Sequence, residues 1–385
     1  MRSRHVLLTA AGLHMVTETA LAPFYPELFR AAFGVHDLAA TGWFVGLSRI
    51  AAILALPLWG LATRRWRMEH LVLCGQSIAV VLTGCLALAP SWAVFTAIGV
   101  ALVAAKAVVL LAYPATARTH PEGLLSGVRQ YVAVLQIAIV AASGLGALIV
   151  SAPDPTQALP LLAVVEGVLL VVCAVALRSR RATGEETTVK PADVVPLTAR
   201  VVLPTAVLVL GFHLAGNVVR PYFTEYSSEA GFSEFAGALL FVVAHLAALV
   251  AVKQVRTRPP GLVVPFAVAA AGLVLQAVTA DPLLLALGRA VFGAGLGLGQ
   301  VALDVRVLTT TRGSEAVYGL IAAAQHTALL SAPLIATAGA TWDLAVPLAT
   351  GAGLFAVLAV TTALVPTTLF HPRSSEVSDV PVRTR

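Results

Sequence analysis

The sequence predicts an all-α membrane protein of about twelve transmembrane helices, and three observations support this fold class. Of the 385 residues, 58% are hydrophobic and 11% are charged, and the mean hydropathy is +0.90, values far from those of ordinary soluble domains. The apolar stretches are about twenty residues long, the length of a helix that crosses a hydrocarbon core of about 30 Å. One long polar interruption separates the first six stretches from the last six.

The expected spans are separated by glycine, proline or charged residues. Their approximate limits are 6–29, 39–62, 70–89, 92–116, 124–150, 157–178, 201–224, 235–253, 261–280, 282–305, 315–339 and 344–366. The first span contains His14 and Glu18 and is longer than the apolar core of a cleavable signal peptide. We therefore expect the first helix to remain in the protein.

The distribution of basic residues predicts the orientation in the membrane. Of the 25 Lys and Arg residues, twenty fall in the tails or in loops on one side, four lie within spans, and Arg30 alone falls on the other side. Loops rich in Lys and Arg stay in the cytoplasm, so both termini are expected on the cytoplasmic side of the inner membrane. This placement also explains the net charge of +6, so nucleic acid is not expected as a partner.

The remaining composition argues against an enzyme. The cysteines Cys74, Cys85 and Cys173 lie within spans, are odd in number and lack the spacing of metal ligands, so we expect them to pack as small apolar residues. Neither a Walker motif nor a convergent catalytic set is present in the sequence. We expect no cofactor, no metal and no enzymatic activity.

The polar interruption from Arg178 to Arg200 predicts a division into two halves. We expect a six-helix bundle over 1–178, a cytoplasmic linker over 179–200, a second six-helix bundle over 201–366 and a cytoplasmic tail over 367–385. The linker mixes charges with threonine, glycine and proline, so it cannot bury enough apolar surface to fold alone.

The first helices of the two halves resemble each other. His14 and Glu18 in the first half correspond to His213 and Asn217 in the second, with a spacing of four in both pairs. Each histidine also follows a glycine by two residues. These matches favour an internal duplication, which is a recurring way to build an alternating-access carrier.

With two six-helix halves, a long basic central linker and both termini on one side, the chain resembles the major facilitator superfamily over nearly its whole length. The resemblance implies a cavity between the halves, lined mainly by spans 1, 2, 4, 5, 7, 8, 10 and 11. It also implies a secondary transporter that works by alternating access. The family includes exporters of drugs and natural products, among them carriers that release carboxylate-rich siderophores.

Two local features are candidates for conformational gating. The family's Gly-x-x-x-Asp-Arg loop between spans 2 and 3 corresponds here to Gly60 followed by Arg64 and Arg65, with Arg64 at the position of the acid. The latch that the family builds on that acid is therefore altered. Asp304, with Arg306, lies near the cytoplasmic end of span 10, where a gate pair and a solvated pair are both possible.

Span 10 also carries a ladder of glycines. Arg289 is followed by a glycine at every second position from Gly293 to Gly299, which is similar to the family pattern of span 4. Glycines four residues apart allow close approach of a neighbouring helix, so we interpret the ladder first as a packing device. Span 5 lacks the Gly-Pro pair of many antiporters.

Four cationic side chains lie inside spans and are candidates for substrate binding: Arg49, Lys106, Arg220 and Arg289. A charge at membrane depth is costly unless it faces protein or a water-filled cavity, so we expect Arg49 and Lys106 to face the cavity. For Arg220 the alternative is contact with the outer headgroups, and for Arg289 it is packing between helices. A basic cavity attracts anions and repels organic cations, which favours a carboxylate, phosphate or sulfonate substrate.

His14 and Glu18 are the candidates for proton coupling. They are one helical turn apart and share a helix face, so they can share a proton. The alternative is that Glu18 permanently neutralises Arg49 or Lys106 as a structural ion pair. Glu166, on a span that the family resemblance places at the rim, can pair across to the bundle interior.

Further polar residues within spans extend the candidate substrate site. They are His213 and Asn217 in span 7, Gln136 in span 5 and Gln325 in span 11. For His213 a satisfied structural hydrogen bond is the alternative role.

These expectations converge on a monomeric secondary transporter that moves a small anionic metabolite across the cytoplasmic membrane, with proton-coupled export as the first expectation. A broad-specificity multidrug exporter is one alternative, although aromatic residues make up only 6% of the chain. Uptake of an organic acid is the other.

Overall fold

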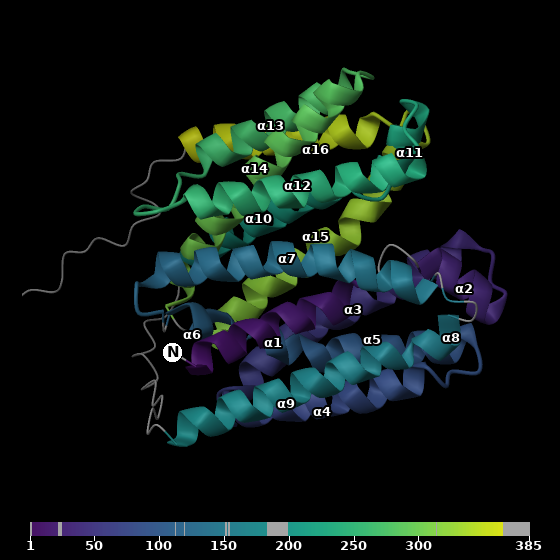
Figure 1. Cartoon of the computed structure of the whole chain (residues 1–385). Helices are drawn as coiled ribbons and strands as arrows, with labels where there is room; N and C mark the ends of the chain where they lie inside the picture. The colour runs from purple at the N-terminus through teal and green to yellow at the C-terminus, as the bar shows by residue number, and fades with distance from the viewer. Residues whose placement is uncertain are drawn as a thin grey trace, which may run out of the picture.

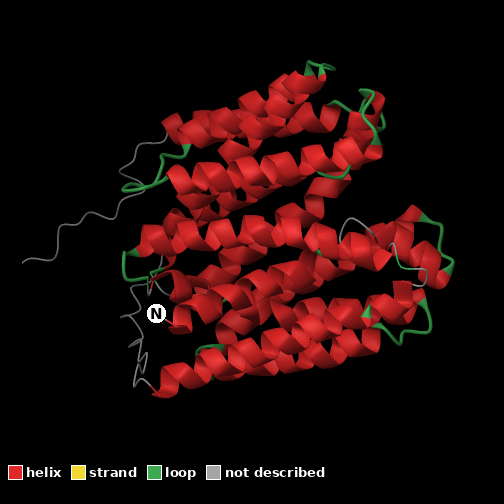
Figure 2. Cartoon of the chain, viewed as in Figure 1, coloured by secondary structure: helices red, strands yellow, loops and turns green. Residues whose placement is uncertain are grey.

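A computed structural model describes residues 2–21, 25–111, 113–118, 120–150, 152, 155–182, 199–312 and 314–364. All regular secondary structure in these ranges is helical (Figure 2). Most of the predicted linker over 179–200 and the whole of the predicted tail over 367–385 lie outside the described residues.

Twelve of the described helices have 15 residues or more. They are α1 (Arg2–Thr19), α3 (Leu38–Ala62), α4 (Met68–Leu86), α5 (Trp92–Leu110), α7 (Leu124–Val150), α9 (Pro160–Ala182), α10 (Ala199–Asn217), α12 (Glu234–Gln254), α13 (Val263–Ala277), α14 (Pro282–Thr311), α15 (Glu315–Ala340) and α16 (Val346–Leu364). Seven of them, α3, α4, α5, α7, α14, α15 and α16, contain stretches long and apolar enough to cross a membrane. Segments of α9, α10, α12 and α13 are apolar but shorter.

Three expected spans are each divided into a long and a short helix. The short helices of the described chain are α2 (Tyr25–Phe33), α6 (Tyr113–Arg118), α8 (Pro155–Ala158) and α11 (Phe223–Glu229). The spans predicted over 6–29, 92–116 and 201–224 therefore end too late, since α1, α5 and α10 end at Thr19, Leu110 and Asn217. Pro26 and Pro114 are second residues of α2 and α6, and Pro221 precedes α11. Proline is tolerated in a first turn but interrupts a helix interior, which explains why new helices begin there.

The helices form two groups that lie one above the other in Figure 1. In the first group α1 packs on α7 and α9, and α4 and α3 pack on α5, whereas in the second α14 packs on α12 and α13, and α16 packs on α10 and α13. The main contacts between the groups pair α3 with α15 and α7 with α12 and α14. In each half, therefore, the second and fifth long helices meet the other half.

The start of α1, the end of α9, the start of α10 and the end of α16 lie on one face of the molecule, at the left of Figure 1, which we name the terminal face. The short helices α2, α8 and α11 lie on the opposite face.

The glycines of α14 sit at close helix contacts. A Cβ atom on Gly297 would lie 2.6 Å from the carbonyl oxygen of Ala248 in α12, and one on Gly293 would collide with Ala244 of the same helix. Gly295 faces α13 and would collide with Ala269. The ladder is thus a packing device toward two neighbours, as the sequence predicts.

The two halves are closed against each other at the terminal face. Two of the hydrophobic clusters in the described part of the chain contain residues from both halves, and both lie toward this face. One joins Tyr131 and Val132 of α7 to Val252 of α12 and Leu308 of α14. The clusters that lie toward the opposite face each belong to a single half within the described ranges.

Candidate functional site

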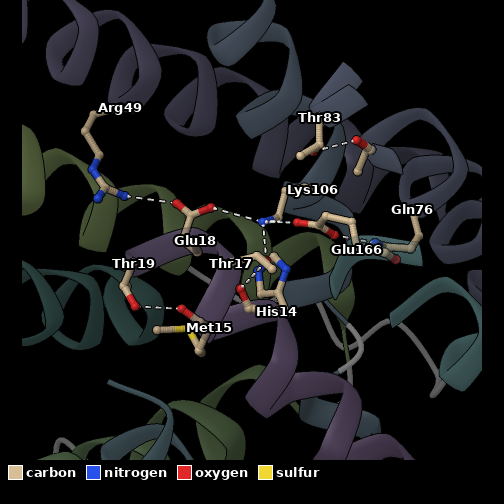
Figure 3. Close-up of polar contacts among 11 residues, drawn as sticks. His14, Met15, Thr17, Glu18, Thr19, Arg49, Gln76, Thr83, Lys106 and Glu166 are labelled. Carbon is tan, nitrogen blue, oxygen red and sulfur yellow. Dashed lines mark hydrogen bonds and ion pairs between the residues drawn. The ribbon is translucent and has the colours of Figure 1, made fainter. Parts of the chain in front are cut away.

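A network of charged side chains lies inside the first half (Figure 3). Five helices contribute to it: α1 with Thr17 and Glu18, α3 with Arg49, α4 with Gln76, α5 with Lys106 and α9 with Glu166. We name these six residues the Lys106 network. Thr17 and Glu18 are consecutive residues of α1, and both reach toward Lys106: the Thr17 hydroxyl lies 2.8 Å from its Nζ atom, and the nearer Glu18 oxygen lies 3.9 Å away.

The ammonium group of Lys106 makes two short contacts and one longer ion pair inside the protein. Its Nζ atom lies 2.7 Å from Oε1 of Glu166, 2.8 Å from Oγ1 of Thr17 and 3.9 Å from Oε2 of Glu18. The side chain is only 3% exposed, and that of Glu166 only 1%. The expectation that Lys106 faces the cavity directly is therefore wrong for this conformation, because the cation is enclosed by its own partners.

Glu166 is held on both sides. Nε2 of Gln76 donates to Oε2 of Glu166 at 2.5 Å and to the backbone carbonyl of Glu166 at 3.2 Å. A carboxylate with a lysine on one oxygen and an amide on the other is compensated for its loss of water. Glu166 therefore serves as the fixed counter-ion of Lys106.

Glu18 lies between two cations and is held more loosely. Its Oε1 is 3.6 Å from Nη1 of Arg49, and its Oε2 is 3.9 Å from Nζ of Lys106, both longer than a direct hydrogen bond. The Glu18 side chain is 19% exposed and that of Arg49 is 22% exposed. Water can thus reach the Glu18–Arg49 pair, although it is excluded from the Lys106–Glu166 pair.

Arg220 and Arg289, the two cations of the second half that the sequence places within spans, have no such partners among the described side chains, since no carboxylate there forms an ion pair with either. Arg289 is 2% exposed, its guanidinium carbon lies 3.8 Å from the ring centre of Phe223, and its Nε donates to the carbonyl of Leu240 at 3.4 Å. Its buried Nη1 atom has no hydrogen-bond partner among the described residues. Arg220 is exposed, in the turn between α10 and α11.

Three histidines, His14 of α1, His213 of α10 and His326 of α15, lie at least partly buried in the molecule. His326 of α15 lies within electrostatic range of His14, Arg49 and His213, and His213 lies within range of Arg220. Nδ1 of His14 and Nδ1 of His326 are buried without a hydrogen-bond partner among the described residues. α15 packs on both α3 and α10, so His326 lies on the helix that joins the two halves.

The predicted amide residues fall in different places. Oε1 of Gln136 in α7 lies 2.7 Å from Nδ1 of His245 in α12, so this pair joins the two halves. Asn217 donates from Nδ2 to the carbonyl of His213, one turn earlier in α10, at 2.7 Å. Gln325 is half-buried in α15 beside His326.

Asp304 connects the halves at the terminal face. Its Oδ2 accepts a hydrogen bond of 3.2 Å from the hydroxyl of Tyr113 in α6, and its Oδ1 accepts one of 2.8 Å from Gln300. The ring of Tyr113 stacks on Tyr131 with centroids 3.7 Å apart and meets Tyr318 of α15 edge-on at 6.2 Å. Asp304 therefore belongs to a closed contact between the halves.

Gly60 lies at a second contact between the halves. A Cβ atom on Gly60 would be 2.9 Å from Cα of Ala316 and 3.0 Å from the carbonyl oxygen of Glu315, so only glycine allows α3 to meet the start of α15 here. Arg64 and Arg65 follow in the exposed loop between α3 and α4.

Sequence reasoning overlooked several residues of these contacts, namely Thr17, Gln76, Tyr113, His245 and Tyr318. Gln76 and His245 had a detectable signal, because each is a strongly polar residue near the middle of an apolar stretch. Tyr113 and Tyr318 lie near predicted span ends, where tyrosine is common, so their pattern did not distinguish a gate from an interface belt.

Two groups of helices, each with members long enough to cross a membrane, a closed contact between the groups on one face and buried charges are features typical of a membrane carrier. The sequence identifies its family: the model of the Major Facilitator Superfamily matches residues 7–333, and the chain belongs to this family. It is thus a multi-pass secondary transporter.

A solved structure similar to this chain is the crystal structure of the human organic anion transporter MFSD10 (TETRAN). The TM-score is 0.74 at 15% sequence identity, over 94% of this chain and 99% of that chain. At this identity the similarity confirms the fold alone. No curated protein matches the sequence.

Proposed function

We propose that this transporter moves a small anionic metabolite, such as an organic acid or a carboxylate siderophore, coupled to protons through Glu18. The observation that carries the proposal is a difference in charge between the halves. Arg49 and Lys106 are balanced by Glu18 and Glu166, whereas Arg220 and Arg289 have no acidic partner among the described side chains. An anion would supply the missing charge, and a guanidinium can hold a carboxylate through two hydrogen bonds.

An anionic substrate is also consistent with the description of a similar solved structure. The similar human structure is that of an organic anion transporter. This likeness supports an anionic substrate, and the charges of the described residues are the main argument.

Glu18 suits a proton carrier better than Glu166 does. Its two ion-pair distances, 3.6 and 3.9 Å, are longer than the 2.7 Å between Glu166 and Lys106, and its side chain is more exposed. A proton on Glu166 would leave Lys106 buried without its main counter-ion, which is costly. A proton on Glu18 would instead free Arg49, while Lys106 would keep Glu166.

This arrangement links proton and anion binding. Once Glu18 is neutral, the unbalanced Arg49 adds to the positive charge around Arg220, so a bound proton and a bound anion favour each other. Positive coupling between proton binding and anion binding suits symport, and therefore uptake of an organic acid rather than export. Proton-driven export would need the proton and the anion to exclude each other.

The expected topology assigns a state to this conformation. If both termini are cytoplasmic, as the basic loops predict, the closed terminal face is the cytoplasmic face. The present conformation is then closed toward the cytoplasm, and the exposed Arg220 is the first cation that we expect an external anion to meet.

Glu18→Gln tests the coupling, with Glu229→Gln as a matched control because Glu229 is an exposed glutamate at the end of α11. Purified variants would be reconstituted into vesicles that contain a pH-sensitive dye, and a panel of organic acids, carboxylate siderophores and cationic drugs would be applied. We expect anions to drive proton movement with the wild type and with Glu229→Gln, but not with Glu18→Gln.

Substrate class is measured separately, because a ligand that binds the native state raises the melting temperature. We expect anions to stabilise all three proteins, including Glu18→Gln. Proton coupling at the wild-type rate in Glu18→Gln would rule out Glu18 as the proton site. Stabilisation by lipophilic cations alone would reassign the protein to multidrug transport.

The direction of proton movement decides between symport and export. Protons that enter together with the anion would support uptake, and protons that move against the anion would support the export expected from the sequence.

A further inference from the structure

An open groove of about 440 Å³ lies between α7 and α12 at the terminal face, away from the Lys106 network. The first half contributes His120, Ser126, Arg129 and Gln130 to its wall, and the second half contributes Lys253 and Arg256. The groove thus crosses the line along which the halves meet.

The groove carries a positive charge. Arg129, Lys253 and Arg256 line it together with one acid, Glu122. Nη1 of Arg129 donates at 2.5 Å to the carbonyl of Val255, the residue that follows α12, which fixes the guanidinium across the line where the halves meet. A guanidinium has five N–H donors, and this bond uses one of them. Lys253 and Arg256 are exposed.

The depth at which the groove lies along α7 and α12 indicates what kind of ligand it can bind. α7 begins at Leu124 and α12 ends at Gln254, so the basic side chains lie where two membrane-spanning helices emerge from the apolar core. Below the charges the wall is apolar, with Ala133 and the buried Val252. Basic groups above an apolar wall at this depth match a phosphate headgroup with acyl chains beneath it.

We propose that this groove binds the phosphate of an anionic phospholipid from the leaflet at the terminal face. The lipid contacts cations of both halves, and therefore stabilises the conformation in which the terminal face is closed. Since neither Glu18 nor Arg220 takes part, this site is independent of the identity of the transported substrate.

The chain provides a matched test. Lys253→Gln with Arg256→Gln removes two exposed charges from the groove, whereas Arg258→Gln with Arg312→Gln removes two exposed charges from loops that do not line it. Each purified protein would be mixed with phosphatidylglycerol or with phosphatidylcholine, and retained lipid would be counted by native mass spectrometry. Melting temperatures would be measured in the same mixtures.

We expect the wild type and the loop variant to retain phosphatidylglycerol in preference to phosphatidylcholine and to melt at higher temperature with it. The groove variant should bind phosphatidylglycerol about fivefold more weakly for each charge removed, since a basic residue near an anionic surface contributes about 1 kcal/mol. Equal retention of the two lipids by the wild type would overturn the proposal. So would equal losses in the groove and loop variants, which would indicate attraction by overall charge.

A soluble competitor separates a lipid from a free phosphate. Glycerol phosphate shares the phosphate group but has no acyl chains, and we expect it to leave the retained phosphatidylglycerol in place. Displacement of the lipid by glycerol phosphate at comparable concentration would assign the groove to a soluble phosphate and contradict a lipid site.

Discussion

The two halves of this transporter hold their buried cations in different ways. In the first half Lys106 and Arg49 lie beside Glu166 and Glu18, at distances from 2.7 to 3.9 Å. In the second half Arg289 is enclosed by aromatic rings and the carbonyl of Leu240, and no described carboxylate neutralises it. The two cations of the Lys106 network are thus balanced by two carboxylates, whereas Arg220 and Arg289 have no acidic partner among the described side chains.

This difference indicates that the two related bundles have different roles. A balanced network is stable without a ligand and needs only one mobile proton to change its charge. An unbalanced pair of arginines depends on a ligand, because cation–π contacts offset part of the desolvation of a guanidinium but do not neutralise it. We infer that the first half responds to protons and the second half attracts the anion.

Breaking the balance of the first half should have the largest effect. Glu166→Gln leaves the enclosed Lys106 without its main counter-ion, and we expect it to lower the free energy of unfolding by about 3 kcal/mol or more. Glu18→Gln should cost much less, because water reaches that pair. Reversible unfolding in mixed detergents measures both. In the double variant Lys106→Met with Glu166→Gln, stability should largely return; equal losses in all of these variants would contradict the distinction.

Removing a charge from the second half should come next. Arg289→Gln is expected to weaken anion binding about tenfold or more, because a hydrogen bond to a charged group contributes about 1.5–3 kcal/mol. Arg289→Lys keeps the charge but loses the planar guanidinium, so its affinity should be intermediate. Titration of an organic acid against intrinsic fluorescence checks both. Wild-type affinity in Arg289→Gln would leave Arg289 as a packing residue only.

Adding an acid to the second half should make the halves alike. Asn217 occupies the position that corresponds to Glu18, so Asn217→Asp introduces a carboxylate of nearly the same shape three residues before Arg220. We expect a severalfold loss of anion affinity, since the new acid takes the place of the anion's charge. Asn217→Ser also loses the amide donor to the carbonyl of His213 but adds no charge, and serves as the control. Equal affinities of the two variants would show that charge at this position is unimportant.

The smallest effect is expected at the contact that links the halves in mid-membrane. Gln136→Leu removes one hydrogen bond, to His245, and should lower the free energy of unfolding by about 1 kcal/mol. His245→Leu should cost about the same, and the double variant little more, because the two changes remove one bond. Double-variant unfolding measurements test this; additive losses would indicate separate roles for the two residues.

The fold was largely predictable from the sequence because each membrane-spanning helix corresponds to a long apolar stretch. The predicted ends of two spans were wrong because each apolar stretch contains a proline near its end. The span expected over 6–29 is divided into α1 and α2, and the span expected over 92–116 is divided into α5 and α6. Hydropathy changes little across such a break, whereas the backbone hydrogen bonds do change.

The site was predictable only in part. The sequence indicates that Glu18 lies one turn from His14 and that a nearby cation would pair with it, which agrees with the contacts of Glu18 with Arg49 and Lys106. It does not show that Glu166, from a helix expected at the rim, pairs with Lys106 and keeps it from facing the cavity. That outcome depends on the rotation of α5 and α9 about their own axes, which only packing determines.

The long helix α14 has a consequence for how the two ends of the molecule communicate. Arg289 and Asp304 lie 15 residues apart on this one helix, which corresponds to about 22 Å along its axis. Its glycines hold it tightly against α12 and α13, so it has little freedom to bend on its own. α14 can therefore act as a rigid rod, so that an axial displacement that begins at Arg289 reaches the Tyr113 contact of Asp304 as the same displacement.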